Sequence, residues 1–380
     1  MIKDAGSFAV AMDIDAAGLP FLKNLTPPAG SKTVEELREI VKEAEVPFII
    51  KGIMTVKGAL KAKEAGAESS GQETSKAAGA GEADASGETY QIGVLQLVQH
   101  DALDAANKGF FAALDEAGIN YEADQQNASG EQANCMTIAE KLVNDGSDLI
   151  LAIATPAAQA VAGVTEEIPV LLTAVTDPAE SGLVNDNEKP GVNVSGTSDL
   201  TPVKEQIDLL KQLLPDAEKV GLLYCSAESN SQLQIAMAEE ACKEAGLSCE
   251  EYTVPSSNEI QSVVESMVGK VDVIYAPTDN VIAAGMSTVA MIATDNQIPV
   301  ICGEAGMVNA GGLATYGIDY YQLGYMTGEQ AIEILTKGAD VAEMPIGYLP
   351  AERCALTVNK TTADALGIDI SGLEGAEIVE

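Results

Sequence analysis

The sequence predicts an α/β protein whose main part consists of two doubly wound lobes, each built on a parallel sheet. From Tyr90 onward, apolar runs alternate with helix-like stretches of about 10–15 residues, a pattern typical of parallel sheets. The chain also repeats itself: DLILAIATPAAQAVAG at 148–163 and VDVIYAPTDNVIAAG at 271–285 both run from an apolar strand through Thr or Pro into an Ala-rich helix. The offset of about 120–130 residues is the length of one α/β lobe, which predicts two halves facing one another.

The first 88 residues differ from the rest. Residues 1–67 predict a short β-α-β-α fragment, with strands at Phe8–Ile14 and Pro47–Ile50 and helices at Thr33–Ala44 and Val56–Ala65. This segment carries nine basic and nine acidic residues, whereas the remaining 313 residues carry twelve basic and forty-nine acidic ones. Residues 68–88 are rich in Gly, Ala, Ser and Glu, a composition that predicts a flexible, disordered linker.

The elements of the two lobes follow from apolar periodicity and helix-end signals such as Thr201-Pro202. We expect strands at Ile92–Leu97, Asn120–Ala123, Leu149–Ile153, Val170–Ala174, Gly191–Val194, Val220–Cys225, Ser248–Thr253, Val273–Ala276, Val300–Cys302 and Leu313–Tyr316. We expect helices at Leu103–Ala117, Glu131–Asn144, Ala157–Val164, Thr201–Leu214, Ser231–Ala245, Glu259–Val268, Ala283–Asp295 and Tyr321–Thr336.

Three stretches have the character of crossings between the lobes. They are Gly196–Asp199, Gly317–Asp319 and Met344–Leu349. The predicted first lobe therefore comprises residues 89–198 and 318–343, and the second comprises 199–317 and 344–380. A hinge of three short segments is a known way for two lobes to close on a ligand.

Composition excludes several classes of function. The net charge of −37 argues against binding to nucleic acids or to anionic membrane surfaces. The six cysteines include no C-x-x-C pair and are expected to be free thiols, and His100 is the single histidine, so we expect no metal site, no cofactor and no His-dependent catalysis. No apolar run reaches the length of about 20 residues that spans a bilayer, and no signal peptide or lipobox cysteine is visible.

Polar side chains follow the predicted strands, at the edge where ligands of α/β proteins bind. In the first lobe these candidate site residues are Gln96, His100, Thr155, Ala157, Thr176 and Asp177. In the second lobe they are Ser226, Glu228, Asn230, Ser231, Thr278, Asp279, Asn280 and Glu304, and Asp319 stands beside a crossing. A Ser, Thr, Asp or Asn residue after a strand is by itself typical of a helix cap, and His100 by itself is typical of a loop, but together these residues predict a polar cleft.

The cleft predicts a zwitterionic ligand. It offers carboxylates, hydroxyls and helix starts but no Lys or Arg, which phosphates and dicarboxylates usually require. Asp279, Glu304 or Asp319 would take an ammonium group, and the helix starts near Ala157 and at Ser226–Ser231 would take a carboxylate. A free amino acid fits this pattern. A nucleoside or a sugar remains an alternative, because Asn and Asp also suit hydroxyl groups.

Several longer motifs resemble one family. IGVLQLVQHDALDAANKGF, LAIATPAAQA, TAVTDPAESGLV, VSGTSD, LLYCSAESNS, VIYAPTDNVIAAGM and GEAGMVNAGGLATYGIDYYQLG occur in this order over about residues 90–370. They resemble the ABC-transporter substrate-binding proteins of the tryptophan, tyrosine and phenylalanine type. The resemblance implies a type I periplasmic-binding-protein fold and an aromatic or large apolar L-amino acid as ligand.

The resemblance also implies the biological setting. Members of this family deliver their solute to a membrane permease and its ATPase, and they are anchored lipoproteins on the extracellular or periplasmic face. The resemblance also implies a set of cleft residues, which are Thr155, Asp177, Ser226, Glu228, Asn230, Thr278, Asp279, Asn280, Glu304 and Asp319. We expect a monomer that makes and breaks no bond, in which the ligand shifts the population from open to closed.

Residues 1–67 resemble a different family. FAVAMDIDAAGLP and TVEELREIVKEAEVPFIIKGIMTVKGALKAKEAGA are similar to the middle of the FMN-dependent α-hydroxy-acid oxidase barrel. In that family the position that Lys51 matches offers a cation to the flavin. The similarity ends at Ala67, before the strands that would complete a barrel. A fragment of this size is not expected to bind FMN, so the oxidase is only a remote alternative.

Overall fold

A computed structural model describes residues 10–13, 48–51, 89–350 and 353–380. The chain divides into two units, residues 1–80 and 81–380. In the first unit, β1 (Val10–Asp13) and β2 (Phe48–Lys51) pair in parallel. The helices expected in this unit and the linker at 68–88 lie outside the described residues, and the role suggested for Lys51 stays a prediction.

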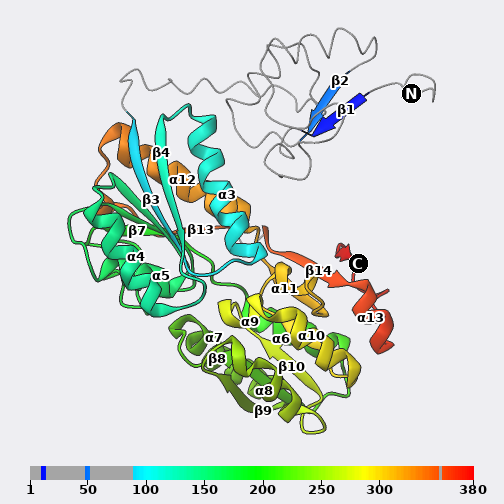
Figure 1. Ribbon diagram of the computed structural model, residues 1–380. Coiled ribbons are helices and arrows are strands. Elements are labelled where there is room, and N and C mark those ends of the chain that lie inside the picture. Colours follow the sequence, from blue (N-terminus) through cyan, green and yellow to red (C-terminus); the bar gives the residue numbers. More distant parts are fainter. Residues whose placement is uncertain (1–9, 14–47, 52–88, 351–352) are drawn as a thin grey trace. The chain divides into compact units, whose positions relative to one another are not determined.

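The second unit begins with a lobe built on a six-stranded sheet, called the first lobe here. Its strands have the order β13-β7-β6-β5-β3-β4, and every pair is parallel. The bounds are β3 (Tyr90–Gln96), β4 (Tyr121–Asn127), β5 (Leu149–Ile153), β6 (Val170–Val175), β7 (Val194–Ser198) and β13 (Gly347–Tyr348). Helices α3 (Asp101–Glu116) and α12 (Tyr320–Lys337) cover one face, and α4 (Gln132–Asn144) and α5 (Thr155–Ala162) cover the other (Figure 1).

The second lobe contains a seven-stranded sheet with the order β15-β14-β12-β11-β10-β8-β9. Its pairs are parallel except that β14 runs antiparallel to β12. The strands are β8 (Lys219–Cys225), β9 (Ser248–Val254), β10 (Val273–Ala276), β11 (Val300–Cys302), β12 (Ala314–Gly317), β14 (Ala355–Asn359) and β15 (Glu377–Val379). The helices are α6 (Val203–Leu213), α7 (Ser229–Glu244), α8 (Ile260–Met267), α9 (Asn280–Ala284), α10 (Met286–Asp295), α11 (Ala305–Asn309) and α13 (Lys360–Leu366).

Each sheet is covered by apolar side chains. The first lobe has one contiguous core, which includes Phe110 and the whole of β5. The second lobe has two cores, one on each face of its sheet: α6 and α7 pack on one face, and α8 and α10 pack on the other. Strands β5, β6 and β10 are buried along their full length, as expected for parallel strands with helices on both faces.

Helices α3 and α12 cross at a very short distance, and two glycines permit it. A Cβ atom added to Gly109 would lie 1.9 Å from the carbonyl oxygen of Tyr321, and one added to Gly324 would lie 1.8 Å from that of Ala106. Figure 1 shows the two helices side by side. This crossing fixes the start of α12, which enters the candidate site described below.

The chain passes between the two sheets three times, after β7, after β12 and after β13, as the sequence predicts. One expected boundary is wrong. The sequence pattern places residues 344–348 in the second lobe, but β13 pairs with β7 in the first sheet, so the last crossing follows Tyr348. A two-residue strand carries no periodic pattern from which its partner could be predicted.

Other elements differ from the prediction in their ends. The strand expected at Gly191–Val194 begins only at Val194, and the helix expected at Ala283–Asp295 is two helices separated by Gly285. Helices α11 and α13 and strands β14 and β15 are absent from the prediction. The remaining predicted strands and helices of the two lobes all occur, three strands with the predicted bounds and the others with shifts at their ends.

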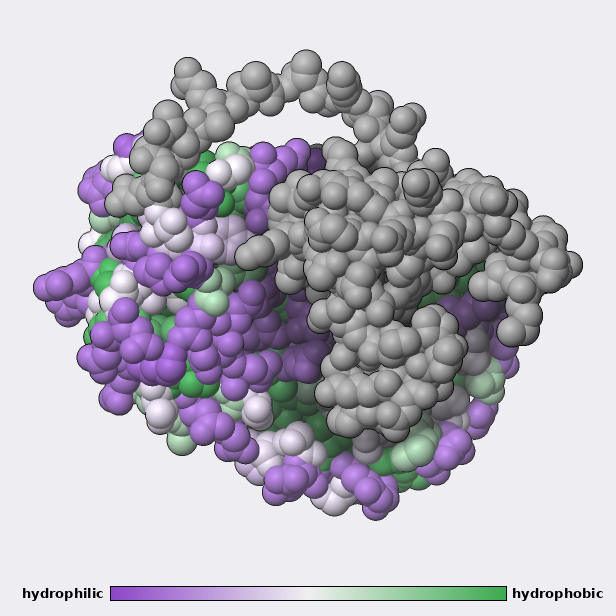
Figure 2. Space-filling view, turned by 45° about the horizontal axis from the view of Figure 1, so that its top comes forward, coloured by the Kyte–Doolittle hydropathy of each residue, from purple (hydrophilic) through white to green (hydrophobic). Residues whose placement is uncertain are grey.

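Hydrophilic side chains cover much of the face shown in Figure 2, in keeping with the 58 acidic residues of the chain. All six cysteines are free thiols. Across the described residues, no helix is long and apolar enough to cross a membrane.

Candidate functional site

A small cavity lies where the strands of both lobes end. Its walls come from His100, Leu103, Ala174, Asp199, Asn230, Thr278, Asp279, Asn280, Ala283, Glu304 and Tyr320. The cavity is very small, with a volume of about 10 Å³, so the lobes lie almost in contact here. Six of the predicted site residues are among these walls: His100, Asn230, Thr278, Asp279, Asn280 and Glu304.

Side chains from the two lobes meet directly around this cavity. His100 precedes α3 in the first lobe, and its Nε2 lies 3.3 Å from Oδ1 of Asn280 in the second. Gln234 on α7 donates to the hydroxyl oxygen of Thr176 across the gap, at 3.2 Å, and to that of Thr278 in its own lobe, at 2.5 Å. Two further bonds, from Gln132 to the Ala227 carbonyl and from Gln159 to the Ser229 hydroxyl, also join the lobes.

The Asp279 carboxylate is held by its own lobe. Oδ1 accepts a hydrogen bond from the backbone N–H of Ile282, which caps α9, and Oδ2 accepts from the backbone N–H of Cys225 and the hydroxyl of Ser231. Burial raises the pKa of Asp279, and these three donors oppose the shift. Asp279 therefore positions the start of α9 against β8.

Glu228 has a similar role behind the cavity wall. It accepts hydrogen bonds from the side-chain amides of Asn280 and Asn230 and from the backbone N–H groups of Asn280 and Val281. Burial raises the pKa of Glu228 to about 8, and the negative charge of Asp279 adds to that shift. Since each of these neighbours donates to Glu228, the carboxylate fixes the orientation of both asparagine amides.

Asp199 is the carboxylate with a free oxygen. It lies in the crossing between β7 and α6 and is only 4% exposed. Oδ2 accepts a hydrogen bond of 2.8 Å from the hydroxyl of Tyr320, whereas Oδ1 is buried without a partner among the described residues. Burial raises the pKa of Asp199 to about 6, and the hydroxyls of Tyr320 and Thr176 oppose that shift.

Glu304 forms the wall beside Asp199. Its carboxylate accepts from the backbone N–H groups of Gly306 and Met307 and so caps α11. Burial raises the pKa of Glu304 to about 7, and the charges of Asp101 and Asp199 add to the rise. The site thus contains several buried carboxylates, and none of the described Lys or Arg residues lines the cavity.

Three polar atoms of the cavity residues lack a hydrogen-bond partner among the described residues. They are His100 Nδ1, Asp199 Oδ1 and Asn230 Oδ1, and all three are buried. The amide of Asn280 donates to Glu228, so its Oδ1 accepts from His100 Nε2, and Nδ1 of the neutral ring is then an acceptor. Burial lowers the pKa of His100, which keeps the ring neutral. All three atoms are therefore acceptors that lack a donor.

The other predicted residues lie off the walls of this small cavity, although Glu228 lines the larger cavity described below. They are Gln96, Thr155, Ala157, Thr176, Asp177, Ser226, Glu228, Ser231 and Asp319. Gln96 bonds Asp104 and Asn107 under α3, Asp177 caps a turn at Ala179, and Asp319 caps α12. Ser226 is exposed.

Sequence reasoning did not select Asp199, Tyr320 or Gln234. The motif that contains Asp199 predicts only the first crossing between the lobes. Tyr320 is the first residue of α12, the helix that follows the second crossing. An acidic residue directly after a strand and within a crossing was a usable signal for Asp199. Gln234 lies within α7, away from any strand end or crossing, so the sequence gives no comparable signal for it.

A second and larger cavity adjoins the first. Its volume is about 290 Å³, and Asn280 lines both. Its apolar walls include Leu97, Val98 and Pro156 from the first lobe and Pro255, Val281 and Ala284 from the second.

The start of α5, at Pro156 on the wall of the second cavity, is strained. Ala154 has φ 84° and ψ 153°, a conformation that is nearly restricted to glycine. The next residue, Thr155, is buried, and its hydroxyl has no partner among the described residues. Strain of this kind is common where a backbone is shaped for a ligand.

Comparison with known proteins identifies the family. The model of the ABC transporter substrate binding protein family matches residues 91–373. The chain belongs to this family. A tyrosine-binding protein of Clostridioides difficile (strain R20291) is 43% identical over 279 residues, which are 72% of this chain and 80% of that protein. Residues 1–67 lie outside the match, and their resemblance to an oxidase barrel stays a prediction.

Solved structures give the same family and fold. The ABC domain from Streptococcus pneumonia in complex with L-Trp is 40% identical, with a TM-score of 0.74 over 77% of this chain and 100% of that one. The ligand-free, open structure of a substrate-binding protein with adhesive properties from Clostridium difficile is 43% identical, but its TM-score is 0.59 over 77% and 99% of the two chains. The better fit to the ligand-bound protein agrees with the direct contacts between the lobes, so the structure represents a closed form.

Proposed function

We propose that the protein binds an aromatic L-amino acid between its lobes and passes it to the permease and ATPase of an ABC transporter outside the cytoplasm. The observation that carries this proposal is the set of three unpartnered acceptors among the described residues, His100 Nδ1, Asp199 Oδ1 and Asn230 Oδ1. An ammonium group has three N–H donors and a positive charge, and it would satisfy these atoms and pair with Asp199. This assignment replaces Asp279, Glu304 and Asp319 as the expected ammonium partners.

The carboxylate of the ligand would bind at the start of α5. The first N–H groups of a helix have no partner inside the helix, and the helix dipole favours an anion there. Thr155 adds a hydroxyl that has no partner among the described residues. Pro156 lines the second cavity, which places this helix start beside the space between the lobes.

The ligand side chain would occupy the second cavity. Its volume of about 290 Å³ and its partly apolar walls suit an aromatic ring. A tyrosine-binding relative and a structure with L-Trp bound, both at least 40% identical, support this class of ligand.

Closure then follows from contacts with both lobes. The proposed ammonium site uses His100 from the first lobe, Asn230 from the second and Asp199 from a crossing, so it is complete only when the lobes meet. A ligand that gains contacts in the closed form shifts the population towards that form.

Thermal-shift measurements with matched ligands test the proposal. L-tyrosine, L-tryptophan and L-phenylalanine should raise the melting temperature, whereas tyramine and 3-(4-hydroxyphenyl)propanoate, which lack the carboxylate and the ammonium group respectively, should not. Stabilisation by uridine or ribose, with none by the three amino acids, would contradict the proposal.

A further inference from the structure

Asp199 and Tyr320 connect two crossings of the hinge inside the cavity. Asp199 lies in the first crossing, between β7 and α6, and Tyr320 ends the second crossing as the first residue of α12. Both side chains are buried, and the Tyr320 hydroxyl lies 2.8 Å from Oδ2 of Asp199. This hydrogen bond joins segments that are 121 residues apart in the chain.

Because of this bond, the two oxygens of the Asp199 carboxylate have different surroundings. Oδ2 is engaged by Tyr320, and Oδ1 has no partner among the described residues. A carboxylate held at one oxygen cannot rotate freely, so the other oxygen keeps a fixed direction. The close packing of α12 on α3 at Gly324 and Gly109 in turn fixes the position from which Tyr320 donates.

The surroundings make ionisation of Asp199 difficult. Glu304 faces it from the start of α11 and Asp279 from the start of α9, while His100, before α3, is kept neutral. Burial raises the pKa of Asp199 to about 6, and the Tyr320 hydroxyl is the first group that opposes this rise. The pKa of Tyr320 itself is raised well above its usual range, so the hydroxyl remains a donor at any physiological pH.

We propose that Tyr320 is a positioning residue for ligand binding, which holds the Asp199 carboxylate aimed into the cavity and ties the occupied site to the hinge. The inference rests on the proposed function, because it assumes that Asp199 pairs with the ammonium group of an amino acid. A protonated Asp199 loses its charge, and affinity is then lost as pH falls through the pKa of the free protein.

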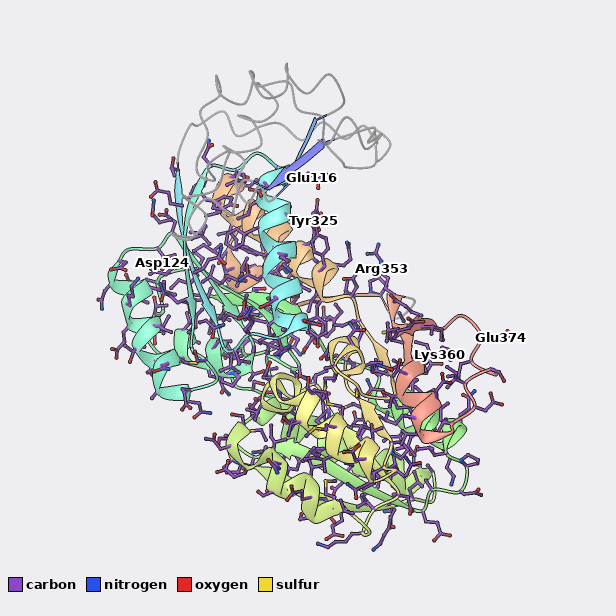
Figure 3. The ribbon with its side chains drawn as sticks, turned by 45° about the vertical axis from the view of Figure 1, so that its right-hand side comes forward. Glu116, Asp124, Tyr325, Arg353, Lys360 and Glu374 are labelled. Atoms are coloured by element: carbon purple, nitrogen blue, oxygen red, sulfur yellow. The ribbon has the colours of Figure 1, made fainter. Side chains whose placement is uncertain are left out.

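The test compares Tyr320→Phe with Tyr325→Phe in the full chain. Tyr325 lies on the same helix, and its hydroxyl also donates to a carboxylate, that of Glu116 at 2.8 Å (Figure 3). Neither Tyr325 nor Glu116 lines the cavity. The dissociation constants for L-tyrosine and L-tryptophan are measured by calorimetry from pH 5.5 to pH 8.5. The melting temperature without ligand reports whether each variant is folded.

In the wild type, affinity should fall as the pH drops through about 6, because Asp199 has a pKa of about 6. Tyr320→Phe should weaken binding roughly tenfold or more, since a hydrogen bond to a charged group is lost. The loss should be larger at pH 6 than at pH 8, and the acid limb of the profile should move upward by about one pH unit. Tyr325→Phe should follow the wild-type profile.

Two results would overturn the inference while leaving the proposed function intact: an unchanged profile in Tyr320→Phe, or a loss of affinity that is equal at every pH. If Tyr320→Phe does not fold, Asp199→Asn decides in the Glu304→Gln background, where the neighbouring carboxyl with a pKa of about 7 no longer titrates. The loss of affinity near pH 6 that Glu304→Gln alone shows should disappear in the double variant, and a loss that persists would overturn the inference. A wild type that binds neither amino acid would refute the proposed function, and the inference would fail with it.

Discussion

The hydroxyl of Ser231 donates a hydrogen bond to the carboxylate of Asp279, with 2.7 Å between Oγ and Oδ2. Both residues follow strands of the second lobe, and both are buried. The same carboxylate accepts from the N–H groups of Cys225 and Ile282. Asp279 therefore belongs first to the fold of its lobe, and only through that fold to the candidate site.

Replacing Asp279 by Ala should destabilise the protein by about 2–4 kcal/mol, because three buried donors lose their acceptor. The variant no longer buries a charged group, but this gain offsets only a fraction of the loss. Asp319→Ala is the control, since Asp319 is an exposed cap of α12 whose loss should cost about 1 kcal/mol. Urea denaturation without ligand measures both. Equal stability of Asp279→Ala and the wild type would show that the hydrogen bonds do not hold the lobe.

The raised pKa of Glu304 should be detectable in the pH dependence of the protein's stability. Burial raises the pKa of Glu304 to about 7, so the folded state binds a proton that the unfolded state releases near pH 4.5. The stabilisation is complete below about pH 4.5 and is lost as pH rises towards 7, and this carboxyl contributes at most about 3 kcal/mol to the change.

Glu304→Gln cannot titrate at this position. Between pH 5 and pH 8 its free energy of unfolding should therefore fall less than that of the wild type. Denaturation curves at several pH values, with both proteins in the same buffers, give the comparison. Parallel curves for the two proteins would be incompatible with a raised pKa of Glu304.

Because α3 and α12 cross so closely, adding one methyl group at the crossing should strongly lower the stability of the protein. In Gly324→Ala the new Cβ would lie 1.8 Å from the carbonyl oxygen of Ala106, so the helices must separate, at a cost of about 3 kcal/mol. Gly372→Ala is the matched control, because a Cβ there meets nothing within 4 Å. Thermal denaturation of both variants tests this, and similar melting temperatures would argue against the close crossing.

The architecture could be predicted because parallel α/β folds produce local sequence patterns. The strands Leu149–Ile153, Val273–Ala276 and Val300–Cys302 have the predicted bounds, since each is an apolar run between polar loops. The three crossings were also predictable. Strand β13 was not, because two residues contain no period and their partner β7 lies about 150 residues earlier in the chain.

The site was only partly predictable, for a related reason. The polar triplet Thr278, Asp279 and Asn280 follows a clear strand, and all three residues line the cavity. Which of them has unused hydrogen-bonding capacity depends on contacts from distant segments. Asp279 is saturated by groups up to 54 residues away, and Asp199 keeps one free oxygen because the distant Tyr320 engages only the other. Local sequence does not contain this information.

The most direct test of the central claim is the dissociation constant of L-tyrosine and of L-tryptophan for the wild type and for Asp199→Asn, measured by calorimetry at pH 7.5. Removing one partner of a buried charge pair costs about 2–5 kcal/mol, so at least one of the two amino acids should bind the wild type and lose affinity about 30-fold or more in Asp199→Asn. Asp208→Asn, which changes an exposed carboxylate on α6, should bind like the wild type. Equal affinity of Asp199→Asn and the wild type would contradict the account.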